Sequence, residues 1–395
     1  MDLLHNTVRP YDWGSPALLP ELMGVPPTGA PQAELWMGAH PAAPSRLSRG
    51  GVPTSLDRVV SEDPEGELGA GTLRRFGPRL PFLLKLLAAD APLSVQVHPD
   101  LAQAQAGFAR ENALGVPLDA PHRNYRDDQH KPEMIVALTP FRGLCGFRSP
   151  ADTADLLASL EVPALRPYAE TLRAVPGPRA LAEVFRAFLR PPDGLVDAVA
   201  RALAVAAAGA DEARTAAYAD IARSCPGDAG LLSALMLRYV ELGPGEALFL
   251  GAGVPHAYLS GLGVEIMASS DNVLRCGLTS KHVDAEELTR VVRFDAPPAR
   301  VLTPREEGGE EVYPAPVDDF RLSRYRLRAG GPRRRVTSDA PQIVLCTAGT
   351  ATVSSAGEDL ALGPGRAVYV PAGAEAVLEG AGTAFRATTG TAEHL

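Results

Sequence analysis

The sequence predicts a mainly β protein that carries an α-helical insert. Short apolar runs bounded by glycine and proline dominate residues 1–149 and return near Gly243, which is typical of strands joined by tight turns. Between them, residues 150–240 follow a helical period and are rich in alanine. A turn-and-strand unit also occurs twice in the chain, so we expect two β barrels with one helical domain.

The most apolar part of the first β segment is LPFLLKLLAADAPLSVQVHPD, residues 80–100. Because residues i and i+2 of a strand point to the same face, Ser94, Gln96 and His98 share one face of this run and two valines share the other. A polar strand face is typical of a solvent-exposed edge, and equally of half a metal or substrate site. The run alone leaves both interpretations open.

Helix signals begin at Ser149, which is a favourable N-cap, followed by Pro150 at the first helical position. Prolines then divide the block into short amphipathic pieces until strands return. We therefore expect a first barrel formed by residues 1–149 and 241–310. The helical domain would comprise residues 150–240, and a C-terminal barrel residues 311–395.

The repeated unit is LGPGEALFLGAGVPHAYL at 242–259, matched by LGPGRAVYVPAGAEAVL at 362–378 with a constant offset of 120. A Pro-Gly turn, a short apolar strand and a second glycine turn recur in double-sheet jelly rolls of the cupin type. His256 in the first copy corresponds to Ala376 in the second. A histidine in one copy only predicts a site in the first barrel and a purely structural second barrel.

Composition excludes several classes of function. The net charge is −9, and the absence of a long basic run argues against a nucleic-acid partner. No apolar run is long enough to span a bilayer and no secretory signal pattern is seen at the N-terminus, so we expect a cytoplasmic protein without a membrane partner. The four cysteines are widely spaced, which indicates free thiols.

Four residues are candidate metal ligands. Gln96 and His98 share a strand face, His256 follows a glycine turn, and Glu133 enters an apolar strand that would otherwise exclude an unpaired charge. This mixed nitrogen and oxygen set suits Zn²⁺ with one open position. The subset of two histidines and one carboxylate also suits non-haem Fe(II), so the spacing does not identify the metal.

The chain resembles the type I mannose-6-phosphate isomerase (phosphomannose isomerase) family over most of its length. The motifs that carry the resemblance are YDWGS (11–15), AELWMGAHPAAPS (33–45), residues 80–100, DDQHKPEMIVALTPFRGLCGFR (127–148) and GVPHAYLSGLGVEIMASSDNVLRCGLTSKHVD (253–284). The resemblance implies two cupin-like barrels, a helical domain and one zinc per chain, with Gln96, His98, Glu133 and His256 as ligands. It also implies a sugar phosphate substrate, and we expect a monomer.

Such an enzyme interconverts mannose 6-phosphate and fructose 6-phosphate through a cis-enediol. It needs a base near C1 and C2 and positive charge beside the developing enediolate. Arg275 is the predicted cation, while Glu265, Lys131 and His130 compete for the role of base. Asp271 would assist ring opening or simply form a turn.

Substrate contacts are expected from further residues of the same motifs. Ser94, Lys85 and Lys281 match positions near the phosphate, and Tyr258, two residues after His256, should point inward. We expect a structural role for Trp13, Glu34, Trp36 and His40. Two alternatives stay open: a cupin oxygenase with Fe(II), and a non-catalytic sugar-binding cupin.

Overall fold

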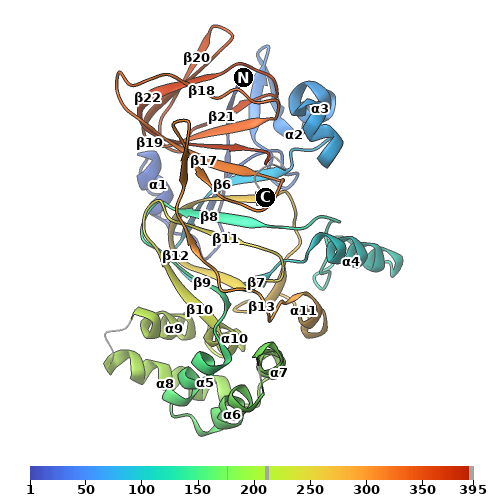
Figure 1. Ribbon diagram of the computed structural model, residues 1–395, viewed down its shortest axis with the longest axis vertical. Helices are drawn as coiled ribbons and strands as arrows, with labels where there is room; N and C mark the ends of the chain where they lie inside the picture. The colour runs from blue at the N-terminus through green and yellow to red at the C-terminus, as the bar shows by residue number, and fades with distance from the viewer. Residues whose placement is uncertain (176, 210–212, 391–395) are drawn as a thin grey trace.

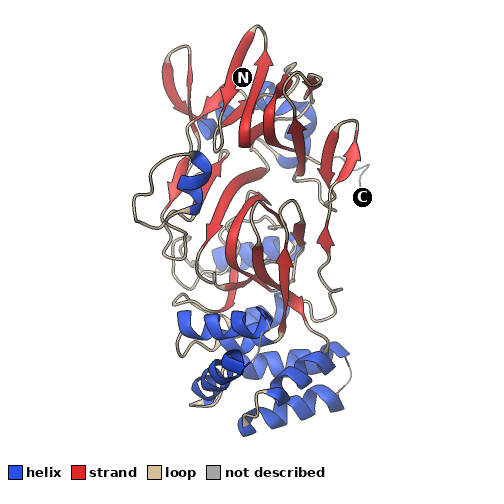
Figure 2. Ribbon diagram, turned by 90° about the vertical axis from the view of Figure 1, so that its left-hand side faces the viewer, coloured by secondary structure: helices blue, strands red, loops and turns tan. Residues whose placement is uncertain are grey.

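The computed structural model describes residues 1–175, 177–209 and 213–390. It is elongated and has three tiers, with strands in the upper and middle tiers and a group of helices at the lower end (Figures 1 and 2). The model is therefore mainly β with helices, as the sequence predicts. None of the described helices is both long and apolar enough to cross a membrane.

The middle tier is one sheet in the order β14-β11-β8-β12-β6-β3-β2, with β7, β9, β10 and β13 paired alongside it. β12 is long and pairs with β6 and β8 in its second half and with β7 and β9 in its first half. The strands of the middle tier are β2 (Thr7–Arg9), β3 (Glu34–Met37), β6 (Phe82–Ala89), β7 (Val95–Val97), β8 (Glu133–Ala137), β9 (Phe141–Phe147), β10 (Leu237–Leu242), β11 (Ala247–Leu250), β12 (His256–Ala268), β13 (Leu274–Gly277) and β14 (Val301–Leu302).

The upper tier is a second sheet in the order β1-β21-β19-β22-β17-β16-β15, to which β18 and β20 are added. The N-terminal strand β1 belongs to this sheet, since Asp2 pairs with Tyr369 of β21. We had expected the N-terminal residues to lie in the other barrel. The strands are β1 (Asp2–Leu4), β15 (Arg305–Glu307), β16 (Glu310–Tyr313), β17 (Arg321–Leu327), β18 (Arg334–Arg335), β19 (Gln342–Ser355), β20 (Glu358–Leu362), β21 (Ala367–Val370) and β22 (Val377–Thr388). A separate hairpin joins β4 (Arg46–Arg49) to β5 (Val52–Ser55).

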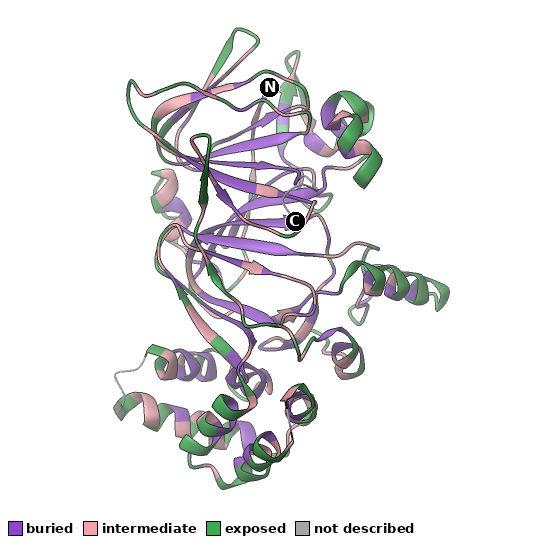
Figure 3. Cartoon of the chain, in the orientation of Figure 1, coloured by how far each residue is buried: buried purple, intermediate pink, exposed green. Residues whose placement is uncertain are grey.

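The two β tiers pack against each other through one apolar face of each sheet. Leu84, Leu86 and Ile266 of the middle tier join Ile343 and Phe385 of the upper tier in one buried cluster. β6 is buried at all eight positions, because one of its faces covers this contact and the other lines the interior of the middle tier. Figure 3 shows buried residues along the strands of both tiers.

The lower tier contains α5 (Pro150–Ser159), η1 (Pro163–Leu165), α6 (Arg166–Ala174), α7 (Gly177–Leu189), α8 (Leu195–Gly209), α9 (Ala213–Ser224) and α10 (Gly230–Leu235). The predicted start is confirmed: the Ser149 hydroxyl accepts a hydrogen bond from the Asp152 amide, and Pro150 is the first helical residue. The helices pack on β7 and β13 through an apolar cluster that includes Val97, Phe185 and Leu274.

Residues 1–149 also contain helices that the prediction of strands and turns missed. They are α1 (Leu18–Met23), α2 (Leu56–Glu62), α3 (Pro64–Phe76) and α4 (Leu101–Ala113), and α11 (Ala285–Val291) follows β13. α4 begins directly after β7 because Asp100 and Gln103 form a capping box. Pro99 and Asp100 therefore end a strand and start a helix.

The repeated unit has the same structure in both tiers. β11 (Ala247–Leu250) and β21 (Ala367–Val370) begin and end at the same offset of 120 residues. Gly245 and Gly365 before them both have positive φ, 91° and 78°, which glycine adopts without steric cost. Each short strand leads through a second turn into a long strand, β12 or β22.

Candidate active site

A buried cluster of His98, Glu133 and His256 lies in the interior of the middle tier. Their potential ligand atoms are all within 4.8 Å of one another. The Glu133 carboxylate lies between the imidazoles, with Oε1 3.4 Å from Nε2 of His98 and Oε2 3.3 Å from Nε2 of His256. β8 places Glu133 here, while His256 begins β12 and His98 directly follows β7.

Gln96 stands beside this cluster in the strand ladder. It is the direct partner of His256 across β7 and β12, and the direct partner of Arg275 across β7 and β13. Directly opposed residues of neighbouring strands project to the same face of a sheet. His256, Gln96 and Arg275 therefore form one row on the interior face.

Both imidazoles are oriented by backbone carbonyls. The Nδ1 atom of His98 lies 2.8 Å from the carbonyl oxygen of Asn272, and that of His256 lies 3.0 Å from the carbonyl oxygen of Val254. If each Nδ1–H donates to its carbonyl, the lone pair of each Nε2 faces the cluster, as in metal-binding histidines. The buried Nε2 of His98 has no hydrogen-bond partner among the described residues, which fits a ligand atom for a metal.

The charge state of the cluster suits a divalent cation. Burial lowers the pKa of His98 to about 4, against the opposing effect of Glu133, so the imidazole is neutral at pH 7. Burial alone would raise the pKa of Glu133, but Lys131 and His98 outweigh it and hold this pKa well below its usual range. Imidazole nitrogens, an ionised carboxylate and an amide oxygen are a donor set for Zn²⁺ or Fe(II).

A second polar group crosses the same interior face on three adjacent strands. Trp36 of β3 is opposite Lys85 of β6, which is opposite Glu265 of β12. The Lys85 ammonium lies 2.9 Å from Oε2 of Glu265, and both side chains are buried. The predicted phosphate ligand Lys85 is therefore already paired with the predicted base.

Tyr258 points inward, as the i+2 spacing from His256 predicts. Its ring centroid is 6.2 Å from that of His256, and its buried hydroxyl has no hydrogen-bond partner with satisfactory geometry among the described residues. Burial, together with the charges of Glu265 and Glu133, raises the pKa of Tyr258 well above its ordinary value. The neutral hydroxyl is thus available to a bound molecule.

Cations gather at the outer side of the row that contains Gln96. The charge of Arg275, followed by burial and Arg126, lowers the pKa of Lys281, and burial and Arg126 lower the pKa of Arg275. These three cations therefore lie near one another, and none of them takes part in the ion pairs found among the described residues. Ser94, half-buried, lies two residues before Gln96.

The other predicted residues have specific partners. The Lys131 ammonium lies 3.1 Å from Oε1 of Glu133 at the metal cluster. The Nε2 atom of His130 instead lies 2.9 Å from Oδ2 of Asp319, on the segment before β17. Asp271 lies 3.4 Å from Nε2 of His40, and the hydrogen bond from His40 lowers the pKa of Asp271.

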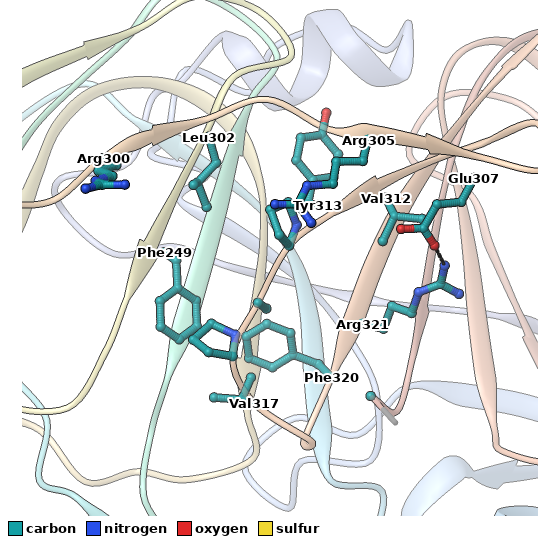
Figure 4. A pocket seen from close by; sticks show the side chains of 14 residues that line it. Phe249, Arg300, Leu302, Arg305, Glu307, Val312, Tyr313, Val317, Phe320 and Arg321 are labelled. Carbon is teal, nitrogen blue, oxygen red and sulfur yellow. Dashed lines mark hydrogen bonds and ion pairs between the residues drawn. The ribbon is translucent and has the colours of Figure 1, made fainter. Parts of the chain in front are cut away.

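A cavity of about 710 Å³ lies elsewhere, between the two β tiers, and none of the predicted site residues lines it. Figure 4 shows its apolar wall, which includes Phe249, Val317 and Phe320, with Arg300 and Arg305 nearby. It offers no carboxylate and imidazole cluster. The buried cluster of His98, Glu133 and His256 therefore lies apart from this cavity.

Sequence reasoning missed two residues of this site. Asn272, to which it gave no role, receives the Nδ1 contact of His98 at its carbonyl oxygen, and its buried side chain bonds the backbone of Arg126 and Asp127. A backbone carbonyl leaves no signal in a sequence. Arg126 directly precedes the motif at 127–148, and this position was the one feature of the sequence that could have indicated its place at the site.

Comparison with known proteins agrees with this geometry. The catalytic domain of phosphomannose isomerase type I matches residues 1–150. The mannose-6-phosphate isomerase of Escherichia coli K12 is 41% identical over 94% of this chain and 95% of its own length. That of Emericella nidulans is 32% identical over 89% of this chain and 85% of its own.

Solved structures give the same result. A variant of phosphomannose isomerase from Salmonella typhimurium superimposes with a TM-score of 0.93 at 37% identity, over 99% of this chain and all of that one. A zinc-bound mannose 6-phosphate isomerase superimposes with a TM-score of 0.91 at 37% identity, over 99% of each chain. With such identity along nearly the whole length, this chain belongs to the type I phosphomannose isomerase family.

Proposed function

We propose that this protein is a zinc-dependent isomerase that interconverts mannose 6-phosphate and fructose 6-phosphate. The observation that carries the proposal is the buried His98, Glu133 and His256 cluster, whose two imidazoles lie against backbone carbonyls that can orient them. We assign these three residues and Gln96 as the ligands of one zinc ion. Zinc, when bound, polarises the carbonyl and hydroxyl oxygens of the sugar.

Glu265 is the group that we assign as base between C1 and C2. Burial raises its pKa, the charge of Lys85 opposes this, and the charges of Glu133 and Glu34 add to it. A carboxylate with a raised pKa both removes and returns a carbon-bound proton near neutral pH. The cis-enediol route follows from this assignment.

Proton shuttling between the two sugar oxygens needs a further group. Lys131 is suited to it because its ammonium lies next to Glu133, inside the site. Asp271, with half of its side chain exposed, is assigned to ring opening at the entrance. His130 is a poorer candidate for the base, because its imidazole is held by Asp319.

The phosphate is assigned to the outer cations. Arg126 and Lys281 are exposed and, with the nearby Arg275, form a group that an anion would stabilise. Ser94 would contribute a hydroxyl donor from the strand face of Gln96, and Tyr258 would donate to the sugar. Arg275, which is opposite Gln96 in the strand ladder, is assigned to stabilise the enediolate.

The architecture is proposed in the same terms. We propose that the middle and upper tiers are cupin-type barrels and that the lower tier is a separate helical domain. The divisions are residues 1–149 with 241–310, residues 150–240, and residues 311–395, except that β1 (Asp2–Leu4) and β15 (Arg305–Glu307) join the sheet of the third. We also propose a monomer in the cytoplasm.

A coupled assay tests the function directly. We expect conversion of mannose 6-phosphate to fructose 6-phosphate, loss of activity with a chelator, and recovery on addition of zinc. Full activity after complete removal of the metal would contradict a zinc-dependent enzyme. Oxygen consumption with Fe(II), without isomerisation, would instead support the oxygenase alternative.

A further inference from the structure

Glu34 lies on the interior face of the middle tier, beside the pair of Lys85 and Glu265. It shares its face with Trp36, two residues along β3, and Trp36 is the direct partner of Lys85. Glu34 is 6% exposed, and the other three side chains are as well buried. Water therefore does little to screen the charges of this group.

Glu34 contacts both neighbours. Its Oε2 accepts a hydrogen bond of 2.6 Å from the Trp36 indole nitrogen, and its Oε1 lies 3.5 Å from the Lys85 ammonium. The same ammonium is 5.2 Å from the centre of the Trp36 ring and 2.9 Å from Glu265. Lys85 is thus held on three sides, by two carboxylates and an aromatic face.

This arrangement exceeds what a structural ion pair requires. One carboxylate would neutralise a buried lysine, and a second adds a buried negative charge whose desolvation costs free energy. Burial alone would lower the pKa of Lys85, but the charges of Glu265 and Glu34 outweigh it and raise this pKa. The ammonium stays charged, and Glu34 competes with Glu265 for it.

We propose that Glu34 is a positioning residue for the reaction. Held by Trp36, it fixes the Lys85 ammonium at one place and so orients the Glu265 carboxylate toward the substrate carbons. Glu34 itself acts through Lys85 and needs no contact with the sugar. The inference rests on the proposed function, and it replaces the purely structural role that the sequence suggested for Glu34 and Trp36.

The substitution Glu34→Gln tests this. Glutamine keeps the size and an acceptor for the indole but removes the attraction to Lys85, so kcat should fall about 10- to 100-fold while KM and zinc content change little. An unchanged kcat would overturn the inference. If the wild-type protein itself fails to isomerise mannose 6-phosphate, the proposed function fails instead.

A double-mutant cycle separates positioning from a general structural effect. If Glu34 works through Lys85, adding Glu34→Gln to the Lys85→Met variant should lower kcat no further. Independent, multiplying losses would overturn the inference. Should Glu34→Gln fold poorly, the milder Trp36→Phe, which removes the indole donor to Glu34, should show the same dependence on Lys85.

Glu67 provides the matched control. It is 5% exposed, and its carboxylate is paired with Arg49, which also pairs with Asp2 of the upper sheet. Glu67→Gln should lower the thermal midpoint and leave the kcat of the folded enzyme unchanged. An equal loss of kcat in both variants would mean that any buried carboxylate has this effect, and would overturn the specific role of Glu34.

Discussion

The two β tiers contain the same turn-and-strand unit but fill their interiors differently. In the middle tier, His256 and Tyr258 lie at the start of β12 and face a polar interior. At the same offset in the upper tier, Ala376 and Leu378 are buried in an apolar cluster with Val344 and Val368. The backbone of the unit is shared, so the chemistry depends on which side chains it carries.

The two tiers also differ in the surroundings of their buried polar atoms. The upper tier fills its interior with closely packed apolar side chains, as a stable core does. Among the described residues, both tiers bury polar side-chain atoms that have no hydrogen-bond partner: Nε2 of His98 and the hydroxyl of Tyr258 in the middle tier, and Nε2 of Gln342 and Oγ of Ser354 in the upper tier. Such atoms destabilise a fold unless a ligand satisfies them, and in this part of the chain only those of the middle tier lie beside a carboxylate and imidazole cluster. The upper tier supplies stability without a site of this kind among its described residues.

The largest expected effect comes from removing the residue that distinguishes the copies. His256→Ala should lose zinc and activity together, with a loss in kcat/KM greater than the roughly 10- to 100-fold typical of outer-sphere partners. Ala376→Gly should change neither, and the wild type should hold about one zinc per chain. Metal analysis measures the zinc content and the coupled assay measures the activity. Two zinc ions per chain would contradict the assignment of the metal site to the middle tier alone.

The next effect concerns the base. Glu265→Gln keeps size and shape, and it should lower kcat by about 10²- to 10⁴-fold, the usual contribution of general acid–base catalysis, while zinc stays bound. In D₂O, the wild type should place deuterium at C2 of the mannose 6-phosphate formed from fructose 6-phosphate, and the variant should do so more slowly. Incorporation is partial where a water-excluding pocket returns the original proton.

Two results would contradict this assignment. Exchange at the wild-type rate in Glu265→Gln would transfer the role of base to Lys131 or His130. No deuterium under any condition would favour a direct hydride shift between C1 and C2.

Much of this contrast could be predicted from the sequence, because periodicity and offset are local properties. The shared face of Gln96 and His98, the cap at Ser149 and the histidine present in one copy all follow from spacing. The pairing of Lys85 with Glu265 could not, because it joins strands 180 residues apart and depends on register. For the same reason, the place of β1 in the upper sheet and the carbonyl of Asn272 at His98 had no signal.

A smaller effect is expected at Arg275, which lies in the row with Gln96 and His256. Arg275→Lys keeps the charge but loses the planar fork, so kcat should fall by about 10²-fold, as for a lost oxyanion donor, with zinc still bound. Steady-state kinetics decide the point. A normal kcat with only a raised KM would assign Arg275 to uniform binding of the phosphate.

The smallest effect on catalysis is expected two residues beyond the histidine position, where Tyr258 corresponds to Leu378. Tyr258→Phe removes a buried hydroxyl that has no hydrogen bond of satisfactory geometry among the described residues, so the free energy of unfolding should be unchanged or slightly higher. If that hydroxyl donates to the sugar, kcat/KM should fall roughly 2- to 10-fold, equivalent to one hydrogen bond of about 0.5–1.5 kcal/mol.

Leu378→Ala should do the opposite. It truncates a fully buried side chain in the upper tier and should cost about 2–5 kcal/mol of unfolding free energy, while the folded enzyme keeps its kcat. Denaturant unfolding and steady-state kinetics on both variants test the pair. If Leu378→Ala lowers kcat in fully folded enzyme as much as Tyr258→Phe does, the upper tier takes part in the chemistry, and the division between a reactive and a supporting copy is wrong.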